Sequence, residues 1–189
     1  MSAGDTGGDR PAQPPATQRL FFALWPDAEV RAALAAVASG CGHGRERVLV
    51  PENLHLTLAF LGNVTAGQRA CMEAAATTVN GRSFAMTLDR LGFWPRPRVL
   101  WAGVDAVPAA LEELVADLNS ALATCGYQPE TRPFQAHVTL ARKASRPPRQ
   151  TTISPIRWAV RDFCLAQSVS GERGSEYRVL GRWPLRAET

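Results

Sequence analysis

The sequence HLTL at residues 55–58, inside PENLHLTLAFLG (51–62), recurs almost unchanged as HVTL at residues 137–140, inside RPFQAHVTLAR (132–142). Alternating polar and apolar residues predict β-strands, in which successive side chains point to opposite faces. The histidine and threonine of each tetrapeptide therefore share one face, and the two aliphatic residues of each enter the core. One such tetrapeptide occurs by chance in many proteins, so the repeat itself carries the information.

The surroundings of the two tetrapeptides match as well. An apolar run at 20–25 (LFFALW) and a helix expected over 27–39 precede the first tetrapeptide. A similar run at 99–104 (VLWAGV) and a helix expected over 107–124 precede the second. The order of elements and the 82-residue offset between the histidines indicate one internal duplication, because this period is far too long for a solenoid.

The remaining pattern completes an α+β domain. Thr65 and Gln68 have the spacing of a capping box, which predicts a helix over about 66–79. The fold class we expect is α+β, with two pseudo-symmetric lobes of antiparallel β-sheet flanked by helices and the active cleft between them. We expect residues 1–18 to be a disordered tail and residues 19–189 to be one domain. Further strands are predicted near 83–91, 98–104, 156–169 and 176–183, with a proline-rich loop at 144–155.

Composition narrows the class of protein. The chain has 189 residues, a net charge of +4 and a pI near 9.2, so an anionic partner is plausible but the charge alone is weak evidence. No apolar run approaches the roughly 20 residues that span a bilayer, and the N-terminus lacks the pattern of a signal peptide. We expect a cytoplasmic protein, a monomer, with no membrane association. The four widely spaced cysteines are expected to be reduced, mostly buried thiols.

Two imidazoles facing one cleft suit a particular chemistry. Opening a cyclic phosphodiester with water requires one proton to leave the nucleophile and another to reach the departing oxygen. Neutral imidazole can accept the first proton and imidazolium can donate the second, because the ordinary histidine pKa is near 6.5. The hydroxyls of Thr57 and Thr139 can donate hydrogen bonds to the non-bridging phosphate oxygens. His55 and His137 are therefore the predicted catalytic pair, and no metal or other cofactor is needed.

At these motifs the chain resembles the two-histidine (2H) phosphoesterase superfamily, which is defined by two HxTx motifs. Within it the chain is similar to the RNA 2',3'-cyclic phosphodiesterase family, also called 2'-5' RNA ligase-like. The resemblance covers roughly residues 19–185 and includes RLFFALWP, PENLHLTLAFLG, RPFQAHVTLAR and SEYRVLGRWPL. It implies hydrolysis of RNA 2',3'-cyclic phosphate ends to 2'-phosphomonoesters.

The resemblance also implies roles for single residues. His55 would be the proton donor to the 3'-oxygen and His137 the proton acceptor from water, although the sequence itself is nearly symmetric about them. Arg142 would contact the phosphate, but strict strand alternation points Arg142 away from His137, so a twist or break must redirect it. Members of the family often carry an aromatic residue just before the first motif, where this chain has Arg47-Val48-Leu49-Val50 (47–50), which puts base preference in doubt.

Several other aromatic, histidine and arginine side chains have simpler structural interpretations. Core or lobe packing, rather than base stacking, is the expected role of the five tryptophans. Core packing is also expected for Phe134, which is a modest candidate for base stacking. A structural role is expected for His43, and a solvated basic rim for Arg132, Arg146 and Arg149. Alternative functions are a phosphodiesterase or ligase acting on 2'-5' linkages or cyclic nucleotides, and a non-catalytic module that binds RNA ends. Dinucleotide-binding, P-loop, zinc-protease and serine-hydrolase motifs are absent from the sequence.

Overall fold

The two tetrapeptides lie where two halves of one sheet meet. A computed structural model describes residues 16–41, 46–171 and 174–187. Within these residues an antiparallel sheet has the strand order β7-β4-β5-β6-β3-β1-β8-β9, and β2 pairs with β6. The strands are β1 (Thr17–Leu24), β2 (Arg47–Val48), β3 (Leu56–Thr65), β4 (Phe84–Trp94), β5 (Val99–Gly103), β6 (His137–Arg142), β7 (Thr152–Val160), β8 (Asp162–Gly171) and β9 (Gly174–Pro184).

Among the described residues, a single residue pair joins the two halves of the sheet. Leu56 of β3 pairs with Val138 of β6, whereas β1 and β3 share eight paired positions and β8 and β9 share ten. The sheet is therefore two antiparallel arms, one of β3, β1, β8 and β9 and the other of β6, β5, β4 and β7. This arrangement confirms the predicted α+β fold with two similar lobes, and it places the junction beside both histidines.

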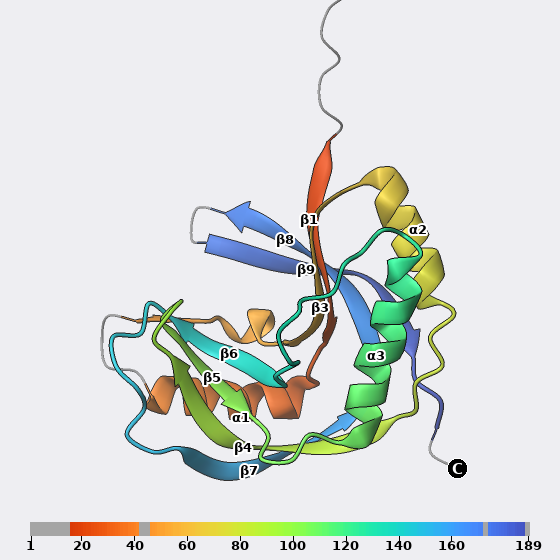
Figure 1. Ribbon diagram of the computed structural model, residues 1–189. Coiled ribbons are helices and arrows are strands. Elements are labelled where there is room, and N and C mark those ends of the chain that lie inside the picture. Colours follow the sequence, from red (N-terminus) through yellow and green to blue (C-terminus); the bar gives the residue numbers. More distant parts are fainter. Residues whose placement is uncertain (1–15, 42–45, 172–173, 188–189) are drawn as a thin grey trace, which may run out of the picture.

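The helices cross from one arm to the other (Figure 1). Helix α1 (Ala28–Gly40) follows β1 but packs on β6 and β7 of the other arm. Helix α3 (Ala109–Ala123) follows β5 but packs on β3, beside α2 (Ala66–Ala76). Each duplicated strand–helix–strand unit thus contributes to both lobes, which ties the lobes into one core.

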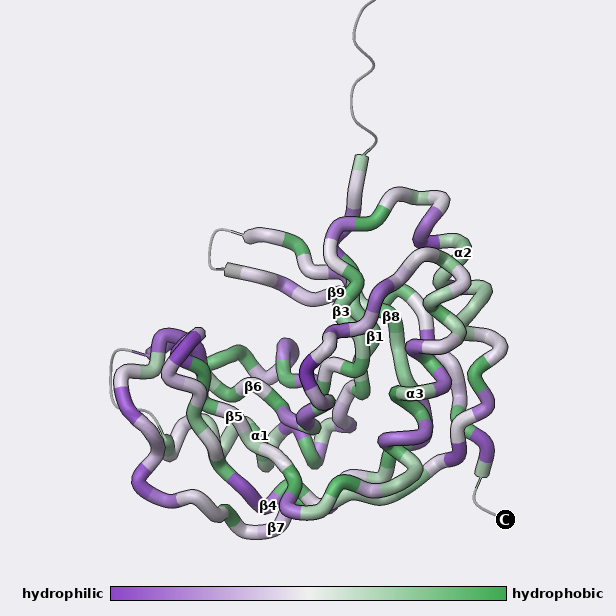
Figure 2. Tube along the Cα trace, in the orientation of Figure 1, coloured by the Kyte–Doolittle hydropathy of each residue, from purple (hydrophilic) through white to green (hydrophobic). Residues whose placement is uncertain are grey.

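The helices begin where their sequence signals predict. Asp27 caps α1, its carboxylate accepting a hydrogen bond of 2.9 Å from the Val30 amide. Thr65 and Gln68 form the predicted capping box of α2. Leu34, Leu114 and Leu118 are fully buried between the helices and the sheet. Figure 2 shows hydrophobic segments gathered in the central strands and hydrophilic segments in the peripheral loops.

Two predicted boundaries are wrong. Strand β1 begins at Thr17, and Gln18 pairs with Val64 of β3, so the expected tail 1–18 extends two residues too far. Residues 1–15 and His43 lie outside the described residues. The single strand expected near 156–169 is two strands, β7 and β8, which belong to different arms. The polar pair Arg161-Asp162 interrupts the apolar pattern where the chain passes between the arms.

The cysteine prediction is also wrong in part. Cys71 of α2 and Cys125, just after α3, form a disulfide with a Cα–Cα distance of 5.9 Å. The two cysteines are 54 residues apart in the sequence, and they meet because α2 packs on α3. Cys41 and Cys164 are free thiols.

Candidate active site

His55 and His137 are held by the same backbone contact. The Nδ1 atom of His55 lies 2.7 Å from the carbonyl oxygen of Asn53, and the Nδ1 atom of His137 lies 2.7 Å from that of Gln135. A carbonyl oxygen can only accept, so each Nδ1 carries the hydrogen and donates it. Nε2 is therefore the nitrogen of each ring that can exchange a proton with a ligand.

The sheet register puts both motifs on one face. Because Leu56 pairs with Val138, His55 lies across from Thr139 and His137 lies across from Thr57. Both histidines and both threonines are half-buried, whereas Leu56 and Val138 are fully buried on the opposite face. Two imidazoles and two hydroxyls thus surround the junction of the arms.

Aromatic rings pack around His55. The indole of Trp25 is stacked on the His55 ring with centroids 5.3 Å apart and an interplanar angle of 11°. The Phe21 ring lies 4.7 Å away, and the Tyr177 ring meets His55 edge-on at 5.0 Å. These contacts fix the orientation of the imidazole and remove it from water. Trp25 packs half-buried against a core cluster, as expected, and its ring also lies against the predicted proton donor.

On the other arm, Trp94 takes the equivalent place beside His137. Its ring meets His137 edge-on with centroids 4.5 Å apart and lies 5.4 Å from Trp101. The Trp101 indole lies across Gly92 and Gly103, where a Cβ atom would collide with the ring. The sequence showed these rings, but only the sheet pairing shows which of them reach a histidine.

Trp158 and Phe134 follow the core prediction. Trp158 is 2% exposed in the main core, and Phe134 packs against that core while half-buried. Trp183 is half-buried and packs on the rings of Phe22 and Phe163. The guanidinium of Arg132 is exposed and pairs with Glu130, as expected for a solvated rim.

Arg142 reaches the same face as His137 because β6 contains a bulge. Trp101 pairs with Thr139 and Leu100 pairs with Ala141, so Leu140 is an extra residue between them. A bulge reverses the alternation of the side chains that follow it. Arg142 therefore projects on the side of His137 and Thr139, and this resolves the conflict with strict alternation.

Burial and charge both lower the histidine pKa values. The pKa of His55 is lowered to about 4, mainly by burial and also by the charges of His137 and Arg142, while the hydrogen bond to Asn53 opposes the shift. Burial is also the main cause of the lowered pKa of His137, and Arg142 adds to it. The Arg142 guanidinium thus disfavours protonation of both imidazoles in the unliganded protein. An anion between them would favour protonation of a ring.

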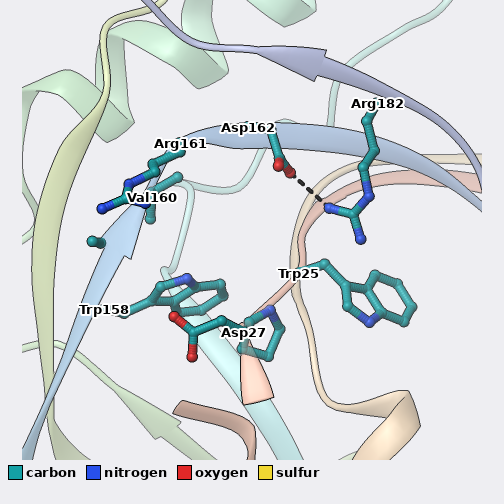
Figure 3. Close-up of a pocket in the computed structure, with 9 residues that line it drawn as sticks. Trp25, Asp27, Trp158, Val160, Arg161, Asp162 and Arg182 are labelled. Carbon is teal, nitrogen blue, oxygen red and sulfur yellow. Dashed lines mark hydrogen bonds and ion pairs between the residues drawn. The ribbon is translucent and has the colours of Figure 1, made fainter. Parts of the chain in front are cut away.

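Two cavities flank the site. One of about 580 Å³ is lined by Arg142, Tyr177, Asn53 and Val50, among others, and it reaches the site through Tyr177, whose ring contacts His55. The other, of about 270 Å³, lies at the start of α1 and is drawn in Figure 3, where Trp25 borders it and Arg182 pairs with Asp162 at 2.8 Å. Trp25 separates this second cavity from His55.

Among the described residues, no three histidine, cysteine, aspartate or glutamate side chains are grouped as metal ligands would be. In the same part of the chain, no helix combines the length and apolarity that crossing a bilayer requires.

Paired histidine–threonine motifs at a pseudo-twofold junction, with an arginine on the same face, define a phosphoesterase type of site. Comparison with known proteins agrees: the LigT like Phosphoesterase family matches residues 24–101 and 103–173, and the chain belongs to that family. The chain is 38% identical to the RNA 2',3'-cyclic phosphodiesterase of Escherichia coli (strain K12) over 89% of its own length and 97% of that protein.

Further relatives and solved structures give the same picture. The chain is 30% identical to the RNA 2',3'-cyclic phosphodiesterase of Archaeoglobus fulgidus, over 86% of this chain and 97% of that one. The crystal structure of E. coli LigT complexed with 3'-AMP superposes with a TM-score of 0.80 at 36% identity, covering 89% of this chain and 98% of that chain.

Proposed function

We propose that the protein hydrolyses the 2',3'-cyclic phosphate ends of RNA to 2'-phosphomonoesters. The observation that carries the proposal is the pair of imidazoles beside Leu56 and Val138, each with Nδ1 bound to a backbone carbonyl and Nε2 left for proton exchange. The family and the activity named for the relatives from E. coli and A. fulgidus support the same substrate.

The proposed reaction needs only the residues of the site. His137 accepts a proton from water through Nε2, and the water oxygen forms a bond to phosphorus. The bond between phosphorus and the 3'-oxygen breaks, and Nε2 of His55 donates its proton to that oxygen. The product carries a 2'-phosphate and a 3'-hydroxyl. Thr57, Thr139 and Arg142 bind the non-bridging oxygens, on which negative charge is concentrated.

The scheme requires His55 to carry a proton that it can donate. With a pKa of about 4, His55 carries that proton near pH 7 only if the bound substrate raises the pKa. At pH 7 the unliganded His55 ring is neutral, because its pKa is about 4. The phosphate anion brings negative charge next to the ring and raises its affinity for a proton. Substrate binding thus creates the acid that the reaction requires.

Incubation with an oligonucleotide that ends in a 2',3'-cyclic phosphate tests the proposal. We expect a 2'-phosphomonoester product, identified by phosphorus NMR or by chromatography against the 2' and 3' standards. A 3'-phosphate product would contradict the acid role of His55, and cleavage or joining of 2'-5' linkages with no action on the cyclic end would favour the alternative activity. Tight binding with no turnover would favour a non-catalytic RNA-end-binding module.

We also propose that the enzyme acts as a cytoplasmic monomer without a cofactor, and that residues 19–189 form one domain. Helices α1 and α3 each pack on the arm opposite to the strand that they follow, which supports a single domain. The Cys71–Cys125 disulfide is the observation that weighs against a cytoplasmic location, because the cytoplasm keeps most thiols reduced. Light scattering that gives a mass near 20.4 kDa would support the monomer. Fractionation of cells that express the protein tests its compartment.

A further inference from the structure

The two halves of the site differ five residues after each histidine. Phe60 follows His55 at this distance, as Arg142 follows His137. Each strand contains an extra residue at the fourth motif position, because Phe22 pairs with Ala59 and Ala23 with Thr57, which leaves Leu58 unpaired as Leu140 is in β6. Phe60 and Arg142 therefore occupy equivalent places on the site face. One half presents a guanidinium there, and the other presents an aromatic ring.

The Phe60 ring is unusually accessible. It is 42% exposed, and among the described residues the only other exposed large hydrophobic side chains are Val48 and Val50. A single exposed apolar side chain is common on protein surfaces, so a role for Phe60 is inferred from its place on the site face and from its neighbours. The Arg19 guanidinium lies over the Phe60 ring, 4.7 Å from its centroid, and is itself exposed. Phe60 and Arg19 thus form a flat, positively charged surface, which we name the Phe60–Arg19 platform.

The platform continues the aromatic surface that begins at His55. Phe60 pairs across the strands with Phe21, and the Phe21 ring lies 4.7 Å from His55. If His55 protonates the departing 3'-oxygen, the ribose lies on this arm of the sheet, and the RNA strand extends over β3 and β1. His55 and Phe60 are five residues apart, but Leu58 is an extra residue in the strand. About four strand rises, or about 13 Å, therefore separate their backbone positions.

We propose that the Phe60–Arg19 platform stacks the nucleobase that precedes the terminal nucleotide of a single-stranded RNA substrate. The proposal rests on the proposed function and extends it from a cyclic phosphate group to an RNA strand. The base of the terminal nucleotide stays near His55, because it is joined to the reacting ribose. The base of the preceding nucleotide lies farther along the RNA strand and matches the distance of about 13 Å between His55 and Phe60. Aromatic rings and arginine planes are the usual stacking partners of unpaired bases, and Arg19 also attracts the phosphate backbone.

The test compares three substrates: a 2',3'-cyclic mononucleotide, a tetranucleotide ending in a cyclic phosphate, and the same tetranucleotide without its second-to-last base. For Phe60→Ala we expect kcat/KM on the full tetranucleotide to fall roughly 5- to 100-fold, the range that loss of one stacked base produces. The loss on the other two substrates should be several times smaller. Phe60→Trp should keep the preference for the full tetranucleotide, and Phe60→Leu should lose it although it stays apolar.

Val50→Ala tests the other place where a base could lie, since Val50 is also exposed but lines the cavity beside Arg142. An equal loss on all three substrates in Phe60→Ala would overturn the proposal, as would a loss confined to Val50→Ala. If the wild-type protein hydrolyses none of them, the proposed function fails by itself. Fluorescence anisotropy then still decides the stacking site: Phe60→Ala should bind the labelled full tetranucleotide more weakly and the version without the base unchanged.

Discussion

Leu56 pairs with Val138 at the one position where, in the part of the chain that the structure describes, the two arms of the sheet are paired, and each of these residues directly follows a histidine. The pair therefore places two equivalent histidines on either side of a pseudo-twofold axis. Both side chains are fully buried, so the packed core beneath them fixes the separation of the imidazoles. The site is built by the junction itself rather than by mobile loops.

Replacement of either histidine tests the proposed proton transfers. His55→Ala and His137→Ala should each lower kcat on a cyclic-phosphate substrate at least roughly a hundredfold, the usual contribution of a general acid or base. The double variant should lose much less than the product of the two single losses, because the two groups act in one step. Circular dichroism and thermal melting show whether the variants are folded. A folded His55→Ala protein with full activity would rule out the acid role.

The charge of Arg142 should be visible in the histidine titrations. Arg142 lowers the pKa of both histidines, so Arg142→Gln should raise both pKa values and should also increase KM for the substrate. NMR titration of the imidazole nitrogens measures the shift. Arg47→Gln is the matched control, since Arg47 pairs with Arg142 across the strands but is not among the causes of either histidine shift. Unchanged histidine titrations in Arg142→Gln would place the guanidinium away from the site.

Phosphate should convert His55 into an acid. In the unliganded protein the pKa of His55 is about 4, and a bound phosphate anion should raise it towards neutrality. NMR titration with and without a saturating 2'-phosphomonoester gives the two values, and His137 should shift in the same direction. Identical titrations in both conditions would contradict a phosphate site between the rings.

The same shift predicts a dependence of stability on pH. The folded-state pKa of His55 is lowered below the ordinary 6.5, so the unfolded chain binds the proton first as the pH falls. The free energy of unfolding should therefore decrease from about pH 6.5 down to about pH 4, and His55→Ala should reduce this dependence. Urea denaturation at a series of pH values measures it.

Removal of metal ions should leave the reaction unchanged, because the proposed steps use only protein side chains. Dialysis against EDTA followed by an assay on the cyclic phosphate is the measurement. Activity that EDTA abolishes and zinc restores would overturn the metal-free mechanism.

The disulfide should contribute to stability but not to catalysis. Cys71 and Cys125 enclose a long loop, for which constraint of the unfolded chain gives up to about 4 kcal/mol. Cys71→Ser combined with Cys125→Ser should therefore lower the melting temperature and leave kcat near its original value. Cys41→Ser, which changes a free thiol, serves as the control. If the melting temperature of the double variant were unchanged, the bond would be absent in solution.

The sequence by itself determined the duplication, the strand character of both tetrapeptides and the choice of His55 and His137. These features depend on local patterns, namely alternating burial in strands and helix capping at Asp27 and Thr65, which the neighbouring residues set. The family resemblance added Arg142 and the proposed acid and base roles. Those roles remain predictions, as do the phosphate contacts of Thr57 and Thr139.

Only the tertiary structure decided which distant residues meet. The bulge at Leu140 turns Arg142 onto the site face, and strand pairing brings Trp25 and Trp94 against the two imidazoles. Packing of α2 on α3 brings Cys71 to Cys125. These contacts depend on the register of the strands and on packing between segments far apart in the chain. Neither can be predicted from the periodicity of a local stretch of sequence.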